Sequence, residues 1–468
     1  MNRLIVLCGA MGVTIATTVS GEDFPLTFRT IPAKDVMSFP GSAGTYAQLR
    51  SPKPSKLKRE PKAMSSKALY GECGDTRTGP VFLVRLDESK GDGKGYDQLI
   101  VDMNQNGDLT DDPVAGRVVL TTERQTSARD TLLFGPIQAP AGKTFAGGRP
   151  VYYAQVYLYE SVVFDSFRIL PSSARRAPNI TSGQLTLKAG WYLDTTVTLN
   201  GLKQKVGVLD GNSNLRLGDV SQPSLSTSRG EKSWYFRSGD SLLVDDDGSG
   251  TFENNAFQSE ACPFGPILYL GAKAYKVTLA ADGGSLQVGP WPQALAEVTL
   301  QPHGDQVRTV TLAWERPGGQ WELIRPGVAN GKVQVPAGNF RLYACSLEGK
   351  GGTREPVMVS AMQRAVRTPV SFAPGKANTL DCGAPLEIKV TATKASSTSR
   401  LALGDNPSSR RPEPQPAVRI SANVTGAGGE VYSTYFKGEG FKSRPPKPTF
   451  RIADAAGRTV ANGNLEFG

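Results

Sequence analysis

The amino-acid sequence predicts a mostly β fold, in which a strand-rich central region precedes two β-sandwich modules. Short segments rich in β-branched and aromatic residues recur along the chain, and turn-forming residues separate them. Glycine and proline are frequent, with 52 and 33 of 468 residues, which favours many short strands and turns over long helices. A chain of this length also has room for several domains.

Residues 1–21 have the pattern of a secretory signal peptide. Arg3 precedes a mostly apolar run that extends to about Val19, and small residues follow it. The run is shorter than the stretch of about 20 apolar residues that a membrane span needs. We therefore expect cleavage near Ser20 or Gly21, export to a periplasmic, cell-surface or extracellular location, and no transmembrane span.

Residues 22–75 are rich in proline and lysine and show little periodicity, so we expect an extended basic arm. The part from Arg50 to Lys67 carries seven Lys or Arg residues against one Glu. A basic segment of this kind either contacts an anionic surface or forms a solvated linker. No aromatic residues are interleaved for stacking on bases, so we expect no specific nucleic-acid partner.

The β-rich region at 76–292 predicts one strand after another. Partial alternation of apolar and polar residues marks the clearest segments, at 79–88, 98–104, 116–123, 151–159 and 162–170. From residue 293 the pattern predicts a β-sandwich at 293–383 and a second β-sandwich at 384–468. The second contains a polar, proline-rich insert at 394–417 that we expect to be disordered.

The C-terminal modules also carry a resemblance to known families. The stretch VQVPAGNFRLY, at 333–343, has apolar alternation on both sides of a short turn. It resembles the repeated hairpin of carboxypeptidase-regulatory-like and transthyretin-like sandwiches, and the modules resemble immunoglobulin-like β-sandwiches. The resemblance implies a secreted binding module.

Four cysteines follow the expected signal peptide: Cys73, Cys262, Cys345 and Cys382. They contain no C-x-x-C spacing and the chain has one histidine, so the pattern excludes a zinc site of the usual kind. An exported protein can form disulfides, and four cysteines allow three pairings. Cys345 and Cys382 lie in one predicted module, which makes them the favoured disulfide candidates.

Three segments of the β-rich region share one pattern of oxygen-bearing side chains. Each begins with an aspartate after an apolar pair, at Asp102, Asp210 and Asp245. Oxygen-bearing residues recur at the third and fifth positions, an apolar residue stands at the eighth, and Asp or Asn stands at the tenth. The sixth position is Gly107 in the first loop and Gly250 in the third, where glycine permits a sharp turn.

Alternating carboxylate and amide groups favour calcium, a hard cation that takes about six to eight oxygen ligands. The candidate ligands in the first and third loops are Asp102, Asn104, Asn106, Asp108, Asp111, Asp112, Asp245, Asp247, Ser249 and Glu253. The weaker candidates in the second loop are Asp210, Asn212, Asn214 and Asp219. Leu215 replaces glycine there and Arg216 follows, so we expect a decayed copy that keeps only the turn. A tight turn without an ion is the alternative for every loop.

These segments resemble EF-hand and dockerin-type calcium loops, which begin with the pattern D-x-[DN]-x-[DN]-G. They depart from it at the twelfth position, where Pro113, Ser221 and Ala256 replace the bidentate glutamate. Strands rather than helices are predicted around them. The resemblance implies Ca²⁺ as the cofactor on a β scaffold, with Asp111 or Asp219 in place of the missing glutamate.

The sequence carries no catalytic motif that assigns a reaction. His303 is the only histidine, and a lone loop histidine is usually just exposed. We therefore expect an exported, calcium-binding, non-catalytic protein that acts in binding, adhesion or scaffolding on an unknown protein or glycan ligand. Two alternatives stay open. One is a secreted carbohydrate-active hydrolase with paired carboxylates, with Glu160, Asp165 and Asp194 as acids that could face a cleft. The other is anionic-surface binding through Arg50–Lys67.

Overall fold

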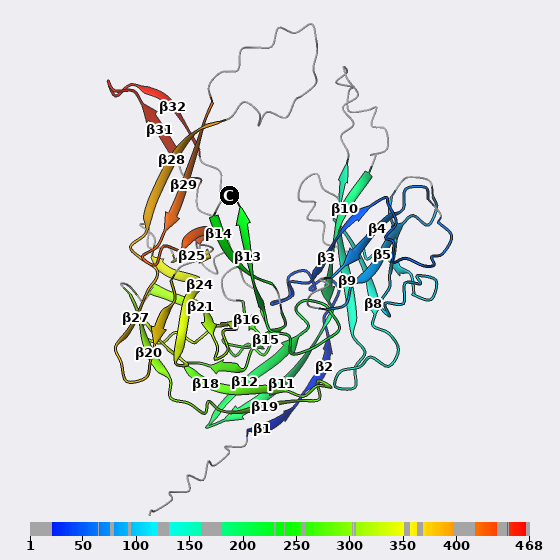
Figure 1. Cartoon of the computed structure of the whole chain (residues 1–468), viewed down its shortest axis with the longest axis horizontal. Helices are drawn as coiled ribbons and strands as arrows, with labels where there is room; N and C mark the ends of the chain where they lie inside the picture. The colour runs from blue at the N-terminus through cyan, green and yellow to red at the C-terminus, as the bar shows by residue number, and fades with distance from the viewer. Residues whose placement is uncertain are drawn as a thin grey trace, which may run out of the picture.

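The structure is a computed structural model that describes residues 21–464 with gaps. The gaps are at 64, 75–78, 92–94, 120–130, 161–179, 229–230, 238, 254–258, 302, 304–305, 351–355, 363–367, 396–416, 438–446 and 448. The described residues form strands β1 to β32 and contain no α-helix, which confirms the mostly β fold (Figure 1). Within these residues no helix is long and apolar enough to cross a membrane.

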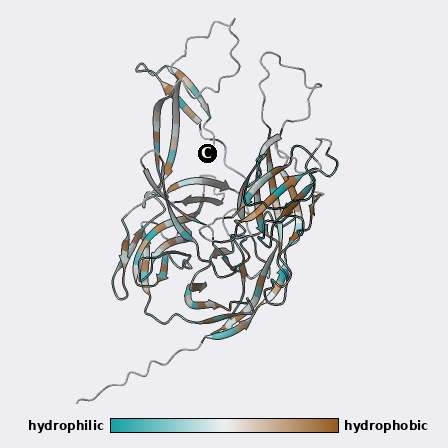
Figure 2. Ribbon diagram, turned by 45° about the vertical axis from the view of Figure 1, so that its right-hand side comes forward, coloured by the Kyte–Doolittle hydropathy of each residue, from teal (hydrophilic) through white to brown (hydrophobic). Residues whose placement is uncertain are grey.

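An eight-stranded antiparallel sheet gathers most strands of the N-terminal part. In spatial order they are β7 (Ala115–Gly116), β6 (Gln98–Val101), β5 (Phe82–Asp87), β4 (Leu69–Cys73), β3 (Thr45–Arg50), β10 (Ile180–Ala189), β9 (Val151–Glu160) and β8 (Thr131–Gln138). The two edges of the sheet come together next to β7 and β8. There the N–H of Val118 donates to the carbonyl of Leu133 at 2.7 Å. Figure 2 shows hydrophobic residues concentrated along these strands.

Two further sheets and a hairpin complete the β-rich region. The five-stranded sheet contains β16 (Ala261–Pro263), β15 (Ser241–Val244), β12 (Leu202–Leu209), β11 (Trp191–Leu199) and β2 (Thr27–Thr30). The four-stranded sheet contains β1 (Glu22–Pro25), β19 (Ser285–Pro290), β18 (Lys273–Leu279) and β17 (Ile267–Leu270). The hairpin joins β13 (Gln222–Ser228) to β14 (Glu231–Arg237). One continuous apolar core lies among the three sheets.

The C-terminal part forms a sandwich of a small and a large sheet. The small sheet contains β23 (Lys332–Val335), β20 (Ala296–Gln301) and β27 (Asn378–Asp381). The large sheet contains β22 (Trp321–Ile324), β21 (Val307–Glu315), β24 (Gly338–Lys350), β25 (Pro356–Met362), β26 (Val370–Phe372), β30 (Val431–Lys437), β29 (Ala417–Thr425) and β28 (Glu387–Ala395). A separate hairpin joins β31 (Thr449–Ala453) to β32 (Thr459–Asn464).

Strand β17 connects the two cores because its side chains alternate between them. Leu268 and Leu270 pack in the core of the β-rich region, whereas Ile267 and Tyr269 pack in the core of the sandwich. Successive side chains of a strand point to opposite faces, so one strand of four residues contributes to both cores. The two parts are therefore joined by buried apolar contacts and by more than a linker.

The structure differs from the predicted extended arm at 22–75. Four strands lie there, β1 to β4, and the first three pair with β19, β11 and β10. The alternation in TYAQLR places Ala47 and Leu49 in the core, but the partner strands are distant in sequence. Local periodicity in this proline-rich segment was therefore too weak to predict its strands. The basic part retains irregular backbone around its one short bridge, between Arg59 and Asp108.

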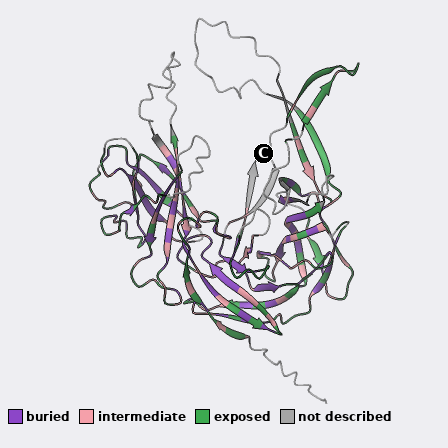
Figure 3. Cartoon of the chain, turned by 180° about the vertical axis from the view of Figure 1, so that it is seen from behind, coloured by how far each residue is buried: buried purple, intermediate pink, exposed green. Residues whose placement is uncertain are grey.

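The C-terminal organisation also differs from the prediction of two separate sandwiches. Strand β30 pairs with β25 of the first module, and Tyr432 lies in the same core. The β28–β29 hairpin extends this sheet and is exposed along much of its length (Figure 3). The predicted hairpin at 333–343 is a crossing between sheets, since β23 pairs with β20 and β24 pairs with β21. The body of the predicted insert, 396–416, lies outside the described residues.

The predicted disulfide between Cys345 and Cys382 is not formed. Both residues are buried free cysteines, as is Cys73. The Sγ atom of Cys345 lies 3.3 Å from the hydroxyl group of Tyr432, on β30. The sequence pattern indicated that both cysteines belong to one module. It could not indicate that β30, with Tyr432, lies beside Cys345.

Candidate metal sites

The first loop follows β6 and wraps around Asp102. The backbone N–H groups of Asn106 and Gly107 donate to the two oxygens of Asp102, at 3.1 and 2.9 Å. Gly107 has a φ of +78°, a backbone conformation that glycine adopts without a Cβ penalty. The sixth position therefore has the sharp turn that the sequence pattern predicts.

Acidic side chains close the other side of the first loop. The amide groups of Asn104 and Asn106 both donate to Oδ2 of Asp111, at 3.2 and 2.8 Å. Burial raises the pKa of Asp112 to about 7, and the negative charges of Asp102, Asp111 and Asp108 add to the shift. A cation beside these carboxylates would remove the repulsion among them.

The basic segment, predicted as part of an extended arm, packs against this loop. The N–H of Lys58 donates to the carbonyl of Gly107, and its Nζ donates to the carbonyl of Asn106, both at 2.8 Å. Arg59 forms an ion pair with Asp108 at 3.3 Å, and the Asp108 carboxylate also accepts a hydrogen bond from Thr110. The positive side chains of Lys58 and Arg59 offset part of the negative charge of the first loop.

The third loop follows β15 and brings three carboxylates together. Ligand oxygens of Asp245, Asp247 and Glu260 lie within 4.8 Å of one another. Asp245 is only 3% exposed; its Oδ2 accepts from the N–H of Gly250 at 2.9 Å, and its Oδ1 has no hydrogen-bond partner among the described residues. A buried carboxylate oxygen without a partner carries a desolvation cost that a bound cation would remove.

Sequence reasoning missed Glu260 because it immediately precedes β16, a strand that lies outside the loop pattern. The N–H of Val244 donates to the carbonyl of Glu260 at 2.8 Å, so the antiparallel pairing of β15 with β16 sets it beside the loop. Its carboxylate accepts from the N–H groups of Asp246 and Glu253, at 2.9 and 2.7 Å. The predicted ligand Glu253 thus contributes a backbone donor, and Ser249 contributes a hydroxyl bonded to Thr251.

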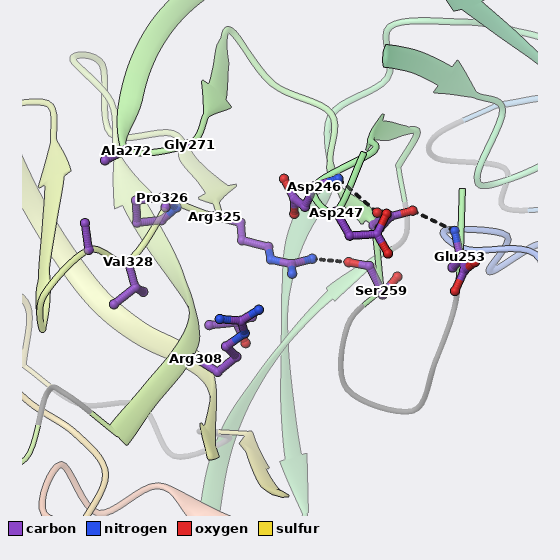
Figure 4. Close-up of a pocket in the computed structure, with 14 residues that line it drawn as sticks. Asp246, Asp247, Glu253, Ser259, Gly271, Ala272, Arg308, Arg325, Pro326 and Val328 are labelled. Atoms are coloured by element: carbon purple, nitrogen blue, oxygen red, sulfur yellow. Dashed lines mark hydrogen bonds between the residues drawn. The ribbon is translucent and has the colours of Figure 1, made fainter. Parts of the chain in front are cut away.

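A pocket of about 470 Å³ lies beside this triad (Figure 4). Its lining combines four acids with two arginines: Asp246, Asp247, Glu253, Glu260, Arg308 and Arg325. Arg325, which follows β22 of the sandwich, donates through Nη1 to the carbonyls of Ser259 and Ala261. The pocket therefore lies where the β-rich region meets the sandwich.

The second loop has the same backbone as the others, although its sixth residue is leucine. The sixth positions, Gly107, Leu215 and Gly250, have φ values of +78°, +63° and +81°. The fourth positions, Gln105, Ser213 and Gly248, have φ values of +60°, +55° and +75°. Asp210 accepts from the N–H groups of Asn214 and Leu215, at 3.0 and 3.1 Å, as Asp102 does in the first loop. The absence of glycine therefore did not change the fold of this loop.

Among the described residues, the acids considered for a hydrolase do not form a pair of facing carboxylates. Asp194 on β11 is buried and forms ion pairs with Arg29 at 3.0 Å and Lys205 at 3.3 Å. Glu160 ends β9, Asp165 lies outside the described residues, and His303 is exposed. Asp194 is therefore explained by its ion pairs.

Comparison of this chain with protein-family models, with curated proteins and with solved structures finds no match. The structure shows a mostly β protein in which three loops of similar backbone, each led by an aspartate, follow strands.

Proposed function

We propose that this chain is an exported β protein that binds Ca²⁺ and acts in binding, adhesion or scaffolding outside the cytoplasm. The triad of Asp245, Asp247 and Glu260 is the observation that carries the proposal. The candidate ligands are all oxygens, which favours a hard cation over zinc or copper. The three segments with one shared backbone support the idea of a repeated cation-binding loop.

The position of the triad suggests what the ion does. Asp247 and Glu260 line the pocket at the junction, and Arg325 of the sandwich bonds the carbonyl groups that flank Glu260. A cation at the triad would hold the third loop in one conformation and would remove repulsion among its acids. Calcium would thereby stiffen the junction between the β-rich region and the sandwich.

The test is a thermal unfolding series of the chelator-treated protein with and without calcium. Extracellular calcium-binding modules bind Ca²⁺ with dissociation constants of about 10⁻⁴ to 10⁻³ M. At ten times that constant, one site adds about 1.4 kcal/mol. For a region of about 200 residues, that free energy raises Tm by about 3–6 °C. Asp245→Asn should remove most of the shift contributed by the triad.

The matched control is Asp23→Asn, which removes an exposed aspartate of β1 outside the three loops. The control should keep the full calcium shift of the wild-type protein. Equal Tm values for the wild-type protein in chelator and in millimolar calcium would contradict the proposal.

Export is the second part of the proposal and rests on the signal-peptide pattern at residues 1–21. N-terminal sequencing of protein recovered outside the cytoplasm should begin near residue 21 or 22. Intact Met1 on protein confined to the cytoplasm would contradict export.

A hydrolase is the second candidate, and the acids of the pocket favour it. Hydrogen bonds from Ser249 lower the pKa of Asp247, whereas burial raises the pKa of Glu260. Two nearby acids with pKa values shifted in opposite directions suit an acid–base pair. Release of reducing sugar from a glycan panel, lost in Glu260→Gln, would support this candidate. No release by the wild-type protein would exclude it for that panel.

A further inference from the structure

We infer that the second loop forms a further divalent-cation site, completed by Asp240 from a segment outside the loop pattern. The ligand is an oxygen-seeking cation of the Ca²⁺ type. The inference goes beyond the triad and uses none of its residues.

Strand register places Asp240 beside the second loop. Leu209, the last residue of β12, is paired with Ser241, the first residue of β15. Asp210 follows Leu209 and Asp240 precedes Ser241, so the two aspartates lie at the same end of the antiparallel pair. The N–H of Asp219 donates to Oδ2 of Asp240 at 2.9 Å, which fixes its carboxylate against the loop.

Two glycines permit this close approach. A Cβ atom on Gly211 would lie 2.6 Å from the carbonyl oxygen of Gly239. A Cβ atom on Gly239 would lie 2.5 Å from the carbonyl oxygen of Asp219. Any larger residue would force the segment that carries Asp240 away from the loop.

Both aspartates are removed from solvent. Asp210 is 0% exposed and Asp240 is 1% exposed. Asp210 accepts hydrogen bonds from two backbone N–H groups and from the hydroxyl of Tyr152. Oδ1 of Asp240 has no hydrogen-bond partner in the described part of the chain, and neither does the buried Oδ1 of Asn212. Two buried oxygens are thus left to a group other than the protein.

Within the described residues, the acids of the second loop also lack a positive partner. No lysine or arginine of the described residues forms an ion pair with Asp210, Asp219 or Asp240. In the first loop, by contrast, Lys58 and Arg59 supply positive charge. Burial of two carboxylates without compensation is costly, and either a shared proton or a cation relieves it. The unpartnered amide and carboxylate oxygens of the second loop favour the cation.

The experiment is calorimetric titration of Ca²⁺ into the chelator-treated full chain. We compare the wild-type protein with Asp240→Asn, Asp245→Asn and the exposed control Asp23→Asn. Asp240→Asn should remove one binding event that Asp245→Asn retains. The double variant should lack both, and the control should match the wild-type isotherm.

Each outcome is decisive for one site. An Asp240→Asn isotherm equal to the wild-type isotherm overturns the inference, and a higher Tm of that variant in chelator would then identify a proton-sharing pair. Loss of an event in Asp240→Asn with none in Asp245→Asn would support the second-loop site and contradict the triad. If circular dichroism shows that Asp240→Asn is unfolded, Asp219→Asn tests the same site, with the same expected loss.

Discussion

The hydroxyl group of Tyr152 donates a hydrogen bond to Oδ2 of Asp210 across 2.7 Å. Tyr152 belongs to β9 of the eight-stranded sheet, whereas Asp210 follows β12 of the five-stranded sheet. Both residues are buried. This contact joins two sheets through Asp210, the first residue of the second loop.

Removal of this hydroxyl group should destabilise the protein. Tyr152→Phe leaves Asp210 with one donor fewer in a buried site, and hydrogen bonds to charged groups contribute about 1.5–3 kcal/mol. We expect a loss of that size in urea unfolding. Tyr159→Phe on the same strand is the control, because its bond to Gln184 is exposed. A loss no greater in Tyr152→Phe than in the control would show that the buried contact contributes little.

The chelator-treated protein should lose stability as the pH rises through the acid range. Burial raises the pKa of Asp112 from 3.8 to about 7, so the folded state binds this proton more tightly than the unfolded chain does. The contribution of this carboxyl group to the free energy of unfolding is therefore greatest below about pH 4. It is lost as the pH rises to about 7. Asp112→Asn should flatten that part of the profile, measured by urea unfolding at several pH values. A wild-type profile that rises with pH in chelator, unchanged in Asp112→Asn, would contradict this assignment.

Backbone strain should distinguish the first loop from the third. Gly107 and Gly250 both have positive φ, so alanine at either position costs about 1–2 kcal/mol. A Cβ atom on Gly107 would also lie 2.8 Å from the carbonyl oxygen of Lys56, whereas nothing lies within 4 Å of one on Gly250. Gly107→Ala should therefore lower the free energy of unfolding more than Gly250→Ala. Equal losses would mean that the basic segment does not pack on the first loop.

The four cysteines should stay reduced and react slowly in the folded protein. Burial raises the pKa values of Cys73, Cys262 and Cys382 to about 12, and it raises that of Cys345 as well. The thiolate is the reactive form, so alkylation at pH 8 should require unfolding. Mass spectrometry of labelled peptides reads each site. A bridged Cys345–Cys382 peptide from the native protein would restore the disulfide predicted from the sequence.

The sequence predicted the β fold and the three aligned loops because both signals are local. Alternation marks strands, and the spacing of Asp102, Asn104 and Asn106 marks a loop that wraps on itself. Glu260 and Asp240 could not be predicted in the same way, because strand register brings them to the loops. The expectation that Leu215 would weaken the second loop rested on a local preference for glycine at positive φ. The surrounding structure holds this leucine at such a φ, so the loop keeps its backbone.

The most direct test of calcium binding is a crystal structure of the wild-type protein determined in millimolar CaCl₂. We predict a calcium peak at about 2.3–2.6 Å from carboxylate oxygens of Asp245, Asp247 and Glu260. Only water or a salt-bridged side chain among these three carboxylates, in crystals grown at about ten times the expected dissociation constant, would contradict it.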